Sequence, residues 1–151
     1  MLTKTNKQKG AKYWDDTFFF FDIETIDNQH KKLFELFDLI IELNAKNDDS
    51  ESISKIIDEL NDYADYHFRT EEDLMAKAKT KDTEMHLQQH AFFKNQMKEF
   101  RRMYAYQNQS LTDLMIVFLR KWFLMHIYDV DYQYIKSVKR HLKSNLQNEQ
   151  E

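Results

Sequence analysis

The sequence predicts an all-α protein built as an up-down-up-down antiparallel four-helix bundle, with an extended N-terminal arm and a short C-terminal helix. The 151 residues include no proline and a single glycine, whereas hairpins and sandwiches need turn residues in quantity. Apolar residues recur at steps of three and four along four long segments, which is the pattern of helices with one buried face. Short polar breaks separate these segments, and short loops favour antiparallel neighbours.

The elements follow in order along the chain. An arm over residues 1–24 precedes the bundle, which we place at residues 25–135, and a C-terminal helix with a polar tail covers 136–151. The arm contains YWDDTFFFFDIETID, which has no helical period, and we expect it to pack across the bundle as an extended segment. Four helices are expected at about 26–46, 52–79, 83–104 and from 111 to the YDVD segment. YQYIKSVKRHLKS then predicts the fifth, shorter helix.

Composition excludes several classes of protein. The net charge is −4 with both signs interspersed, and no basic block could follow a phosphate backbone, so we expect no nucleic-acid partner. The absence of cysteine excludes disulfides, thiolate metal sites and cysteine nucleophiles. No run of about 18 apolar residues could span a membrane, and the basic amino terminus lacks an apolar signal core. We therefore expect a cytoplasmic protein.

Histidines occupy the inward stripes of all four helices. Five of the six lie there: His30, His67, His86, His90 and His126. A single histidine on an apolar stripe is most often a hydrogen-bonded core residue, but five on four helices indicate a shared site. His86 and His90 are four residues apart, as are His67 and Glu71, so each pair leaves one helix face one turn apart. A buried carboxylate costs several kcal/mol unless a cation accompanies it, so Glu71 predicts a buried metal.

The set of candidate ligands indicates the metal. His126 and Asp131 are five residues apart, which fits a shared site if the helix loosens at YDVD or if Asp131 reaches in from a neighbouring angle. Nitrogen and carboxylate oxygen without sulfur suit iron or manganese, and seven ligands are too many for one tetrahedral zinc. Two octahedral ions that share two bridging carboxylates and one bridging oxygen would keep a single position open. Such a site could bind one small ligand end-on, whereas a structural zinc site would need no open position.

Four motifs resemble those of a known family. IDNQHKKLF, HFRTEEDLM, HLQQHAFF and WFLMHIYDVDYQY are similar to the motifs of the bacterial hemerythrins, in the same order and over about residues 14–135. The resemblance implies a di-iron centre in which His86, His90 and His126 bind one iron, His30 and His67 bind the other, and Glu71 and Asp131 bridge the two with an oxo or hydroxo group. Dioxygen would bind end-on at the second iron as hydroperoxide and leave unchanged.

Neighbours of these ligands are candidates for the surrounding pocket. Four residues are expected to line a dry oxygen pocket, since each lies within four residues of His67 or His126: Phe68, Trp122, Phe123 and Ile127. Tyr134 and Gln89 are expected to support the ligands from the next layer. The family commonly has leucine where this chain has Phe123, and the larger ring is expected to narrow the oxygen path or change the oxidation rate.

The resemblance implies an oxygen-binding protein that stores, delivers or scavenges dioxygen, and not an enzyme. Two alternatives remain open, namely a di-iron redox enzyme that detoxifies peroxide or nitric oxide, and an oxygen or iron sensor that acts through a separate partner. We expect a monomer, with an oligomer as the alternative, that interacts with no membrane. An oxygen-consuming protein is the expected recipient of the gas.

Overall fold

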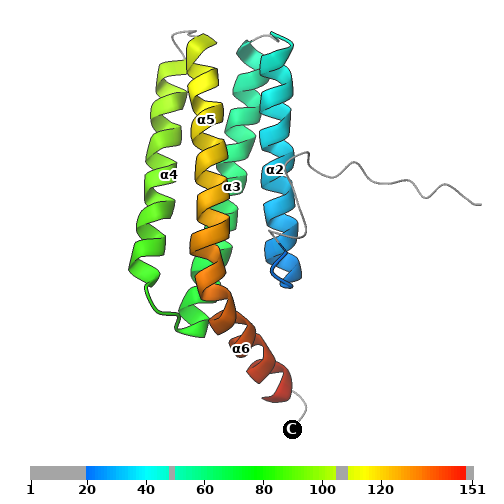
Figure 1. The fold of residues 1–151 in the computed structure, drawn as a ribbon, viewed down its shortest axis with the longest axis vertical. Coiled ribbons are helices and arrows are strands. Elements are labelled where there is room, and N and C mark those ends of the chain that lie inside the picture. Colours follow the sequence, from blue (N-terminus) through cyan, green and yellow to red (C-terminus); the bar gives the residue numbers. More distant parts are fainter. Residues whose placement is uncertain (1–19, 48–49, 105–108, 149–151) are drawn as a thin grey trace, which may run out of the picture.

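Four long helices form an antiparallel bundle. The computed structural model describes residues 20–47, 50–104 and 109–148. The helices are α2 (Glu24–Ala45), α3 (Ser50–Ala78), α4 (Thr83–Tyr104) and α5 (Gln109–Met125), and they run alternately up and down (Figure 1). α2 and α4 each contact both α3 and α5, so the four helices close into a ring. The fold class predicted from the sequence is confirmed.

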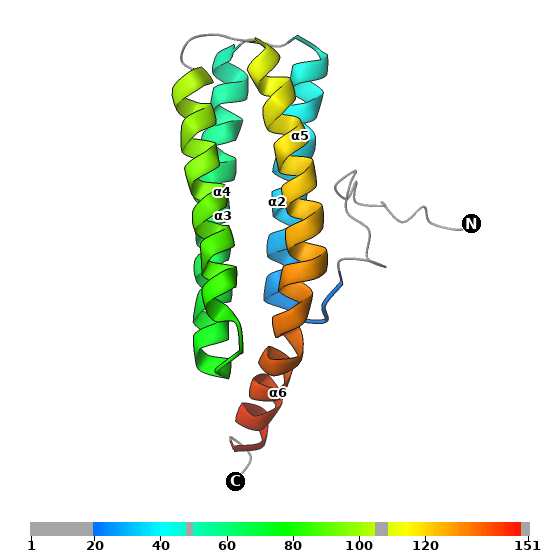
Figure 2. The same ribbon diagram turned by 60° about the vertical axis from the view of Figure 1, so that its left-hand side comes forward.

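The chain continues beyond α5 without a break. A π-helical turn, η1 (His126–Asp131), joins α5 directly to α6 (Tyr132–Asn148). In Figure 2, α6 bends away from the axis of α5 and extends past the end of the bundle. There it contacts α3, so the C-terminal helix predicted from the sequence is present and covers part of that end.

The apolar stripes of the helices meet in one core. Its largest fully buried side chains include Phe34, Phe37, Phe93, Phe123 and Leu60, which come from α2, α3, α4 and α5. Burying each such side chain is worth about 1.5–3 kcal/mol, so this core holds the four backbones in fixed register. Among the described residues no helix combines the length and apolar character needed to cross a bilayer.

The expected arm lies mostly outside the described residues. Residues 1–19 are not described, so the prediction that the arm packs across the bundle stays a prediction. The last part of the arm, residues 20–23, is not helical and leads into α2. Phe21 and Ile23 in this short stretch are buried, which ties the entry of the chain to the bundle.

Candidate metal centre

All seven predicted ligands meet at one end of the bundle. Because the helices are antiparallel, the beginnings of α2 and α4 lie beside the ends of α3 and α5. The side chains brought together there are His30, His67, Glu71, His86, His90, His126 and Asp131, and each is at most 3% exposed. Candidate ligand atoms from these residues form two groups, within each of which all atoms lie within 4.8 Å of one another.

Glu71 presents one oxygen to each of the two groups. Its Oε1 lies 3.3 Å from Nε2 of His67 and 3.7 Å from Nε2 of His30. Its Oε2 lies 3.1 Å from Nε2 of His90 and 3.6 Å from Nε2 of His86. The carboxylate is therefore placed between two sets of imidazoles, as a bridging ligand would be.

Asp131 repeats this arrangement from η1. Its Oδ2 lies 3.3 Å from Nε2 of His30, and its Oδ1 lies 3.0 Å from Nε2 of His86 and 3.0 Å from Nε2 of His126. A π turn bonds residue i to i+5, so it brings His126 and Asp131 to the same side of the helix. The predicted loosening at YDVD is confirmed, and the π turn is its cause.

The imidazoles thus divide into two unequal halves. We call His86, His90 and His126 the three-histidine half, and His30 and His67 the two-histidine half. Glu71 and Asp131 belong to both halves. This is the division that the family resemblance implies for two irons, and it leaves fewer protein ligands in the two-histidine half.

The donor atoms suit bound cations. Within the cluster, four buried atoms face one another without a hydrogen bond of good geometry among the described residues: Oε2 of Glu71, Nε2 of His86 and both carboxylate oxygens of Asp131. Burying such atoms is costly unless a cation binds them. Nε2 of His90 lies 3.2 Å from Nε2 of His126, close to the ~3 Å expected for adjacent nitrogens that each lie ~2.1 Å from one ion. The residues therefore fit a pair of metal ions.

Each of three imidazoles is held by a side chain from another helix. His67 Nδ1 lies 2.8 Å from Oε1 of Gln29, and His90 Nδ1 lies 2.9 Å from Oε1 of Glu72. His126 Nδ1 lies 2.9 Å from Oε1 of Gln89. In each pair the imidazole Nδ1–H donates to the oxygen, which leaves the Nε2 lone pair free to bind a metal. These bonds run from α2 to α3, from α3 to α4 and from α4 to η1.

The structure places both predicted supporting residues beside the cluster. The Tyr134 hydroxyl donates a 2.8 Å hydrogen bond to Oε1 of Glu71. Burial, together with the charges of Glu71 and Asp131, holds the pKa of Tyr134 well above its usual value, so the hydroxyl keeps its proton. Gln89 precedes His90 in the sequence, yet its hydrogen bond goes to His126.

Gln29 and Glu72 are supporting residues that the sequence analysis missed. Each directly precedes or follows a candidate ligand, as Gln89 does, and this position was a usable signal. Successive residues on a helix point about 100° apart, so the neighbour of a ligand faces the adjacent helix and its imidazole.

Without metal, the two carboxylates favour protonated imidazoles. Burial lowers the pKa of His30, but hydrogen bonds and charges from Asp131 and Glu71 outweigh it and raise that pKa to about 9. The same opposing causes raise the pKa of His86 to about 9, whereas burial lowers the pKa of His126. Burial alone would raise the pKa values of Glu71 and Asp131, yet the facing imidazoles hold both well below their usual values. Metal ions would replace the imidazole protons.

These shifts predict how the stability of the metal-free protein depends on pH. A raised histidine pKa contributes stability that is complete below the ordinary value of 6.5 and is lost as pH rises through about 9. The free energy of unfolding should therefore fall between pH 6.5 and about 9.5, by on the order of 3 kcal/mol for each of His30 and His86. Urea unfolding across this range measures it. The metal-loaded protein is the control, since its imidazoles are neutral, and an equal fall in both forms would refute the assignment.

Two of the predicted pocket aromatics contact the cluster directly. The Phe68 ring stacks on His90 with centroids 4.0 Å apart, and its centroid lies 5.9 Å from that of His67. The Trp122 ring stacks on His126 at 4.2 Å. Phe68 therefore contacts imidazoles of both halves, and Trp122 covers the three-histidine half.

The other two predicted pocket residues are buried in the adjoining core. Phe123 packs against Phe34 and Phe37 of α2, with centroids 5.7 and 6.2 Å apart, and also contacts Trp122. Ile127 is 1% exposed. Phe123 thus connects the ring layer around the cluster to the apolar core beyond it.

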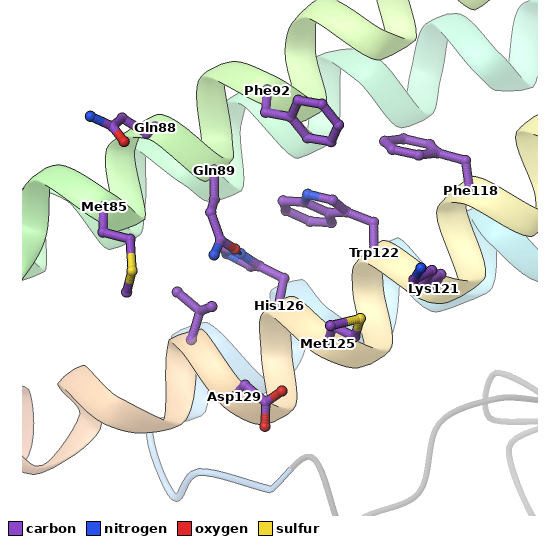
Figure 3. A pocket seen from close by; sticks show the side chains of 11 residues that line it. Met85, Gln88, Gln89, Phe92, Phe118, Lys121, Trp122, Met125, His126 and Asp129 are labelled. Carbon is purple, nitrogen blue, oxygen red and sulfur yellow. Dashed lines mark hydrogen bonds between the residues drawn. The ribbon is translucent and has the colours of Figure 1, made fainter.

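A surface groove approaches the three-histidine half. It lies between α4 and α5, continues along η1, has a volume of about 620 Å³, and includes Trp122, Gln89 and His126 among its lining residues (Figure 3). Its other walls are largely apolar, with Phe92 and Met125 about half exposed. Trp122 and Gln89 therefore stand where this half of the cluster comes nearest to the groove.

Fold and site together define a four-helix-bundle protein with a buried histidine–carboxylate cluster that could hold metal ions. Residues 22–138 match the family model for the hemerythrin HHE cation binding domain. The chain belongs to the hemerythrin family. It is similar to a bacteriohemerythrin of Clostridium acetobutylicum, with 35% identity over 127 residues that cover 81% of this chain and 97% of that protein.

Further relatives and a solved structure also place the chain in the hemerythrin family. A bacteriohemerythrin of Pseudomonas paraeruginosa is 32% identical over 82% of this chain and 79% of its own length. A hemerythrin-like protein of Naegleria fowleri is also 32% identical, over 80% of this chain and 88% of its own length. The crystal structure of a wild-type hemerythrin matches with a TM-score of 0.73 and 26% identity, over 83% of this chain and 95% of that chain.

Proposed function

We propose that this protein binds dioxygen reversibly at a di-iron centre and that it does not consume the gas in a catalytic reaction. The observation that carries the proposal is the position of Glu71 and Asp131, since each carboxylate directs one oxygen to the two-histidine half and the other oxygen to the three-histidine half. His86, His90 and His126 would hold one iron, and His30 and His67 the other. Membership of the hemerythrin family supports this assignment, because oxygen binding is the family's function.

The bound di-iron pair would supply an open coordination position and the electrons that make oxygen binding reversible. The protein's own contribution begins with the three Nδ1 hydrogen bonds, which aim Nε2 of His67, His90 and His126 at the centre. Tyr134 keeps its proton and orients the Glu71 carboxylate.

The rings around the cluster would make the site dry. Phe68 and Trp122 stack on two of the imidazoles and, with the buried Phe123 and Ile127, would exclude water from the bound gas. Five neutral imidazoles would also leave the ferrous pair less negative than a carboxylate-rich site would. This favours release of the gas over oxidation of a second substrate.

One experiment tests the function directly. The protein is reconstituted with ferrous iron without oxygen, and optical spectra are followed through repeated oxygenation and deoxygenation. A charge-transfer band that appears with oxygen and disappears when oxygen is removed is the expected result. A band that is lost irreversibly after one exposure, or sustained oxygen consumption with an electron donor, would refute reversible binding and favour a redox enzyme.

The hydrogen bond from His67 to Gln29 should increase the affinity of the protein for iron by an amount that can be measured. Gln29→Ala is expected to weaken iron binding by about 10- to 100-fold, because the His67 ring loses the partner that fixes its tautomer and direction. Gln88→Ala is the matched control, since Gln88 is exposed on α4 and bonds only weakly to Glu84, at 3.5 Å. Competition with a chelator measures both affinities, and equal values for the two variants would contradict the role of Gln29.

A further inference from the structure

The chain enters α2 through a turn that a buried carboxylate holds in place. Oδ1 of Asp27 accepts a 2.9 Å hydrogen bond from the backbone N–H of Phe21, and Oδ2 accepts a 3.1 Å hydrogen bond from that of Asp22. Asp27 is 5% exposed, although carboxylates are seldom buried without a specific partner. The N-cap residue Ile23 makes no side-chain cap, so Asp27 satisfies donors that lie before the helix.

The turn itself has an unusual backbone. Asp22 has a φ of 59°, in the left-handed region that aspartate tolerates better than most residues. Its side chain lies 3.7 Å from Nζ of Lys139 on α6. The two hydrogen bonds to Asp27 therefore stabilise a conformation that the chain would not adopt readily alone.

The turn places the Phe21 ring on the two-histidine half of the cluster. The ring meets His30 edge-on, with centroids 5.5 Å apart and planes at 77°, and contacts Tyr132 at 6.5 Å. Phe21 is 5% exposed, whereas the neighbouring Phe20 is 56% exposed. Phe21 is thus directed inward onto His30, which in turn contacts His67 at 4.7 Å.

The two halves of the centre are therefore covered differently. Trp122 covers the three-histidine half next to the surface groove. Phe21 comes from outside the four bundle helices, and its turn is held by two hydrogen bonds to the Asp27 carboxylate, one from its own backbone N–H and one from that of Asp22. The Phe21 ring and the His67 imidazole both contact His30, with centroids 5.5 and 4.7 Å away, and Phe21 supplies an apolar aromatic cover for this imidazole.

We infer that Phe21 is a wall of the gas-binding half, and that Asp27 is the positioning residue that holds this wall closed. The inference rests on the proposed function, in which the two-histidine half carries the open coordination position. An apolar ring against His30 keeps water and competing ligands from this half. The sequence segment FDIETIDNQH then combines a cover (Phe21), its anchor (Asp27), a supporting residue (Gln29) and a metal ligand (His30).

Metal release tests the cover without requiring oxygen binding. The full-length protein is loaded anaerobically with ferrous iron, and transfer of iron to excess bipyridine is followed by absorbance. Phe21→Ala and Asp27→Ala are each expected to speed the release of the less tightly held iron by about tenfold, the effect of losing about one hydrogen bond or ring contact. Phe21→Leu, which keeps an apolar cover, should restore most of the wild-type rate.

Two control variants distinguish the loss of the Phe21 cover from a general loss of protein stability. Phe20→Ala removes an exposed phenylalanine next to the cover and should leave the rate within about twofold of wild type. Ile57→Val weakens the buried core by about 1 kcal/mol at a site ten residues, or about 15 Å, along α3 from His67. It should not alter iron release.

Amide hydrogen exchange gives an independent measurement on the metal-free protein. The N–H groups of Phe21 and Asp22 should exchange at least about tenfold faster in Asp27→Ala than in wild type, whereas amides in the middle of α3 should not change.

The results distinguish a failure of the Phe21 cover from a failure of the proposed oxygen binding. Wild-type release from Phe21→Ala, or equal acceleration by Ile57→Val, would overturn the cover. If release and exchange follow the expected order while the oxygen cycle fails, the cover stands and the proposed oxygen binding does not.

Discussion

Replacing Glu71 by glutamine is expected to reduce bound iron from two ions per chain to one or fewer. Glutamine keeps the size of the side chain, but its amide nitrogen cannot bind a cation, so one of the two halves loses its shared ligand. The four distances from the Glu71 oxygens to imidazole nitrogens, 3.1 to 3.7 Å, show that both halves depend on this residue. Loss of outer partners alone weakens metal sites 10- to 100-fold, so loss of a bridging ligand should exceed about 100-fold.

The matched control is Glu59→Gln on the same helix. Glu59 is exposed and pairs with Lys32 at 3.5 Å on the surface, where such a pair contributes little. Iron content after dialysis against a weak chelator measures both variants. Two irons per chain in Glu71→Gln would show that the carboxylate does not bridge metals.

Replacing Phe68 by alanine is expected to produce the second large effect, a loss of about 3–5 kcal/mol in the free energy of unfolding. Phe68 is fully buried and contacts His90, Phe93 and Trp122 with centroids 4.0 to 5.5 Å apart. Alanine would leave a cavity beside the imidazoles of His67 and His90, which the Phe68 ring contacts. Water in that cavity should also speed irreversible oxidation of the iron-loaded protein.

Thermal unfolding should report this change as a fall of about 10 °C in the midpoint. Phe92→Ala is the control, because Phe92 is 52% exposed at the groove and should cost at most about 1 kcal/mol. Phe68→Leu, which keeps most of the volume, should lie between the two. A Phe68→Ala protein as stable as Phe92→Ala would mean that this ring does not support the centre.

The fold and the cluster could be predicted because both leave a regular trace in the sequence. Helical period marks the four bundle helices to within about two residues at the ends we predicted, for example α3 at Ser50–Ala78 against an expected 52–79. His67 and Glu71 occupy positions of the apolar stripe of their helix, and this pattern identified them as buried polar residues. The five-residue step from His126 to Asp131 indicated either a loosened helix or an Asp131 that reaches in from a neighbouring angle, and η1 shows the first of these.

Contacts between helices left a weaker trace, because a place beside a ligand marks a candidate partner but not the imidazole that it contacts. The Nδ1 partners Gln29 and Glu72 depend on how far each helix is rotated about its axis, which periodicity does not fix to the accuracy of a hydrogen bond. Gln89 was chosen for its place before His90, but helix rotation directs it to His126 instead.

Asp27 was missed for a different reason. An acidic residue in the first turn of a helix is favoured by the helix dipole and is usually exposed, so nothing in its sequence position indicated burial. Its role follows only from the left-handed turn at Asp22, which brings two backbone N–H groups to its carboxylate.

The most direct test of the central claim is the iron content of the wild-type chain after anaerobic reconstitution and removal of loosely bound metal. Two buried carboxylates that each face both imidazole sets predict two irons per chain. A ratio of one or less, with the protein folded, would contradict the account.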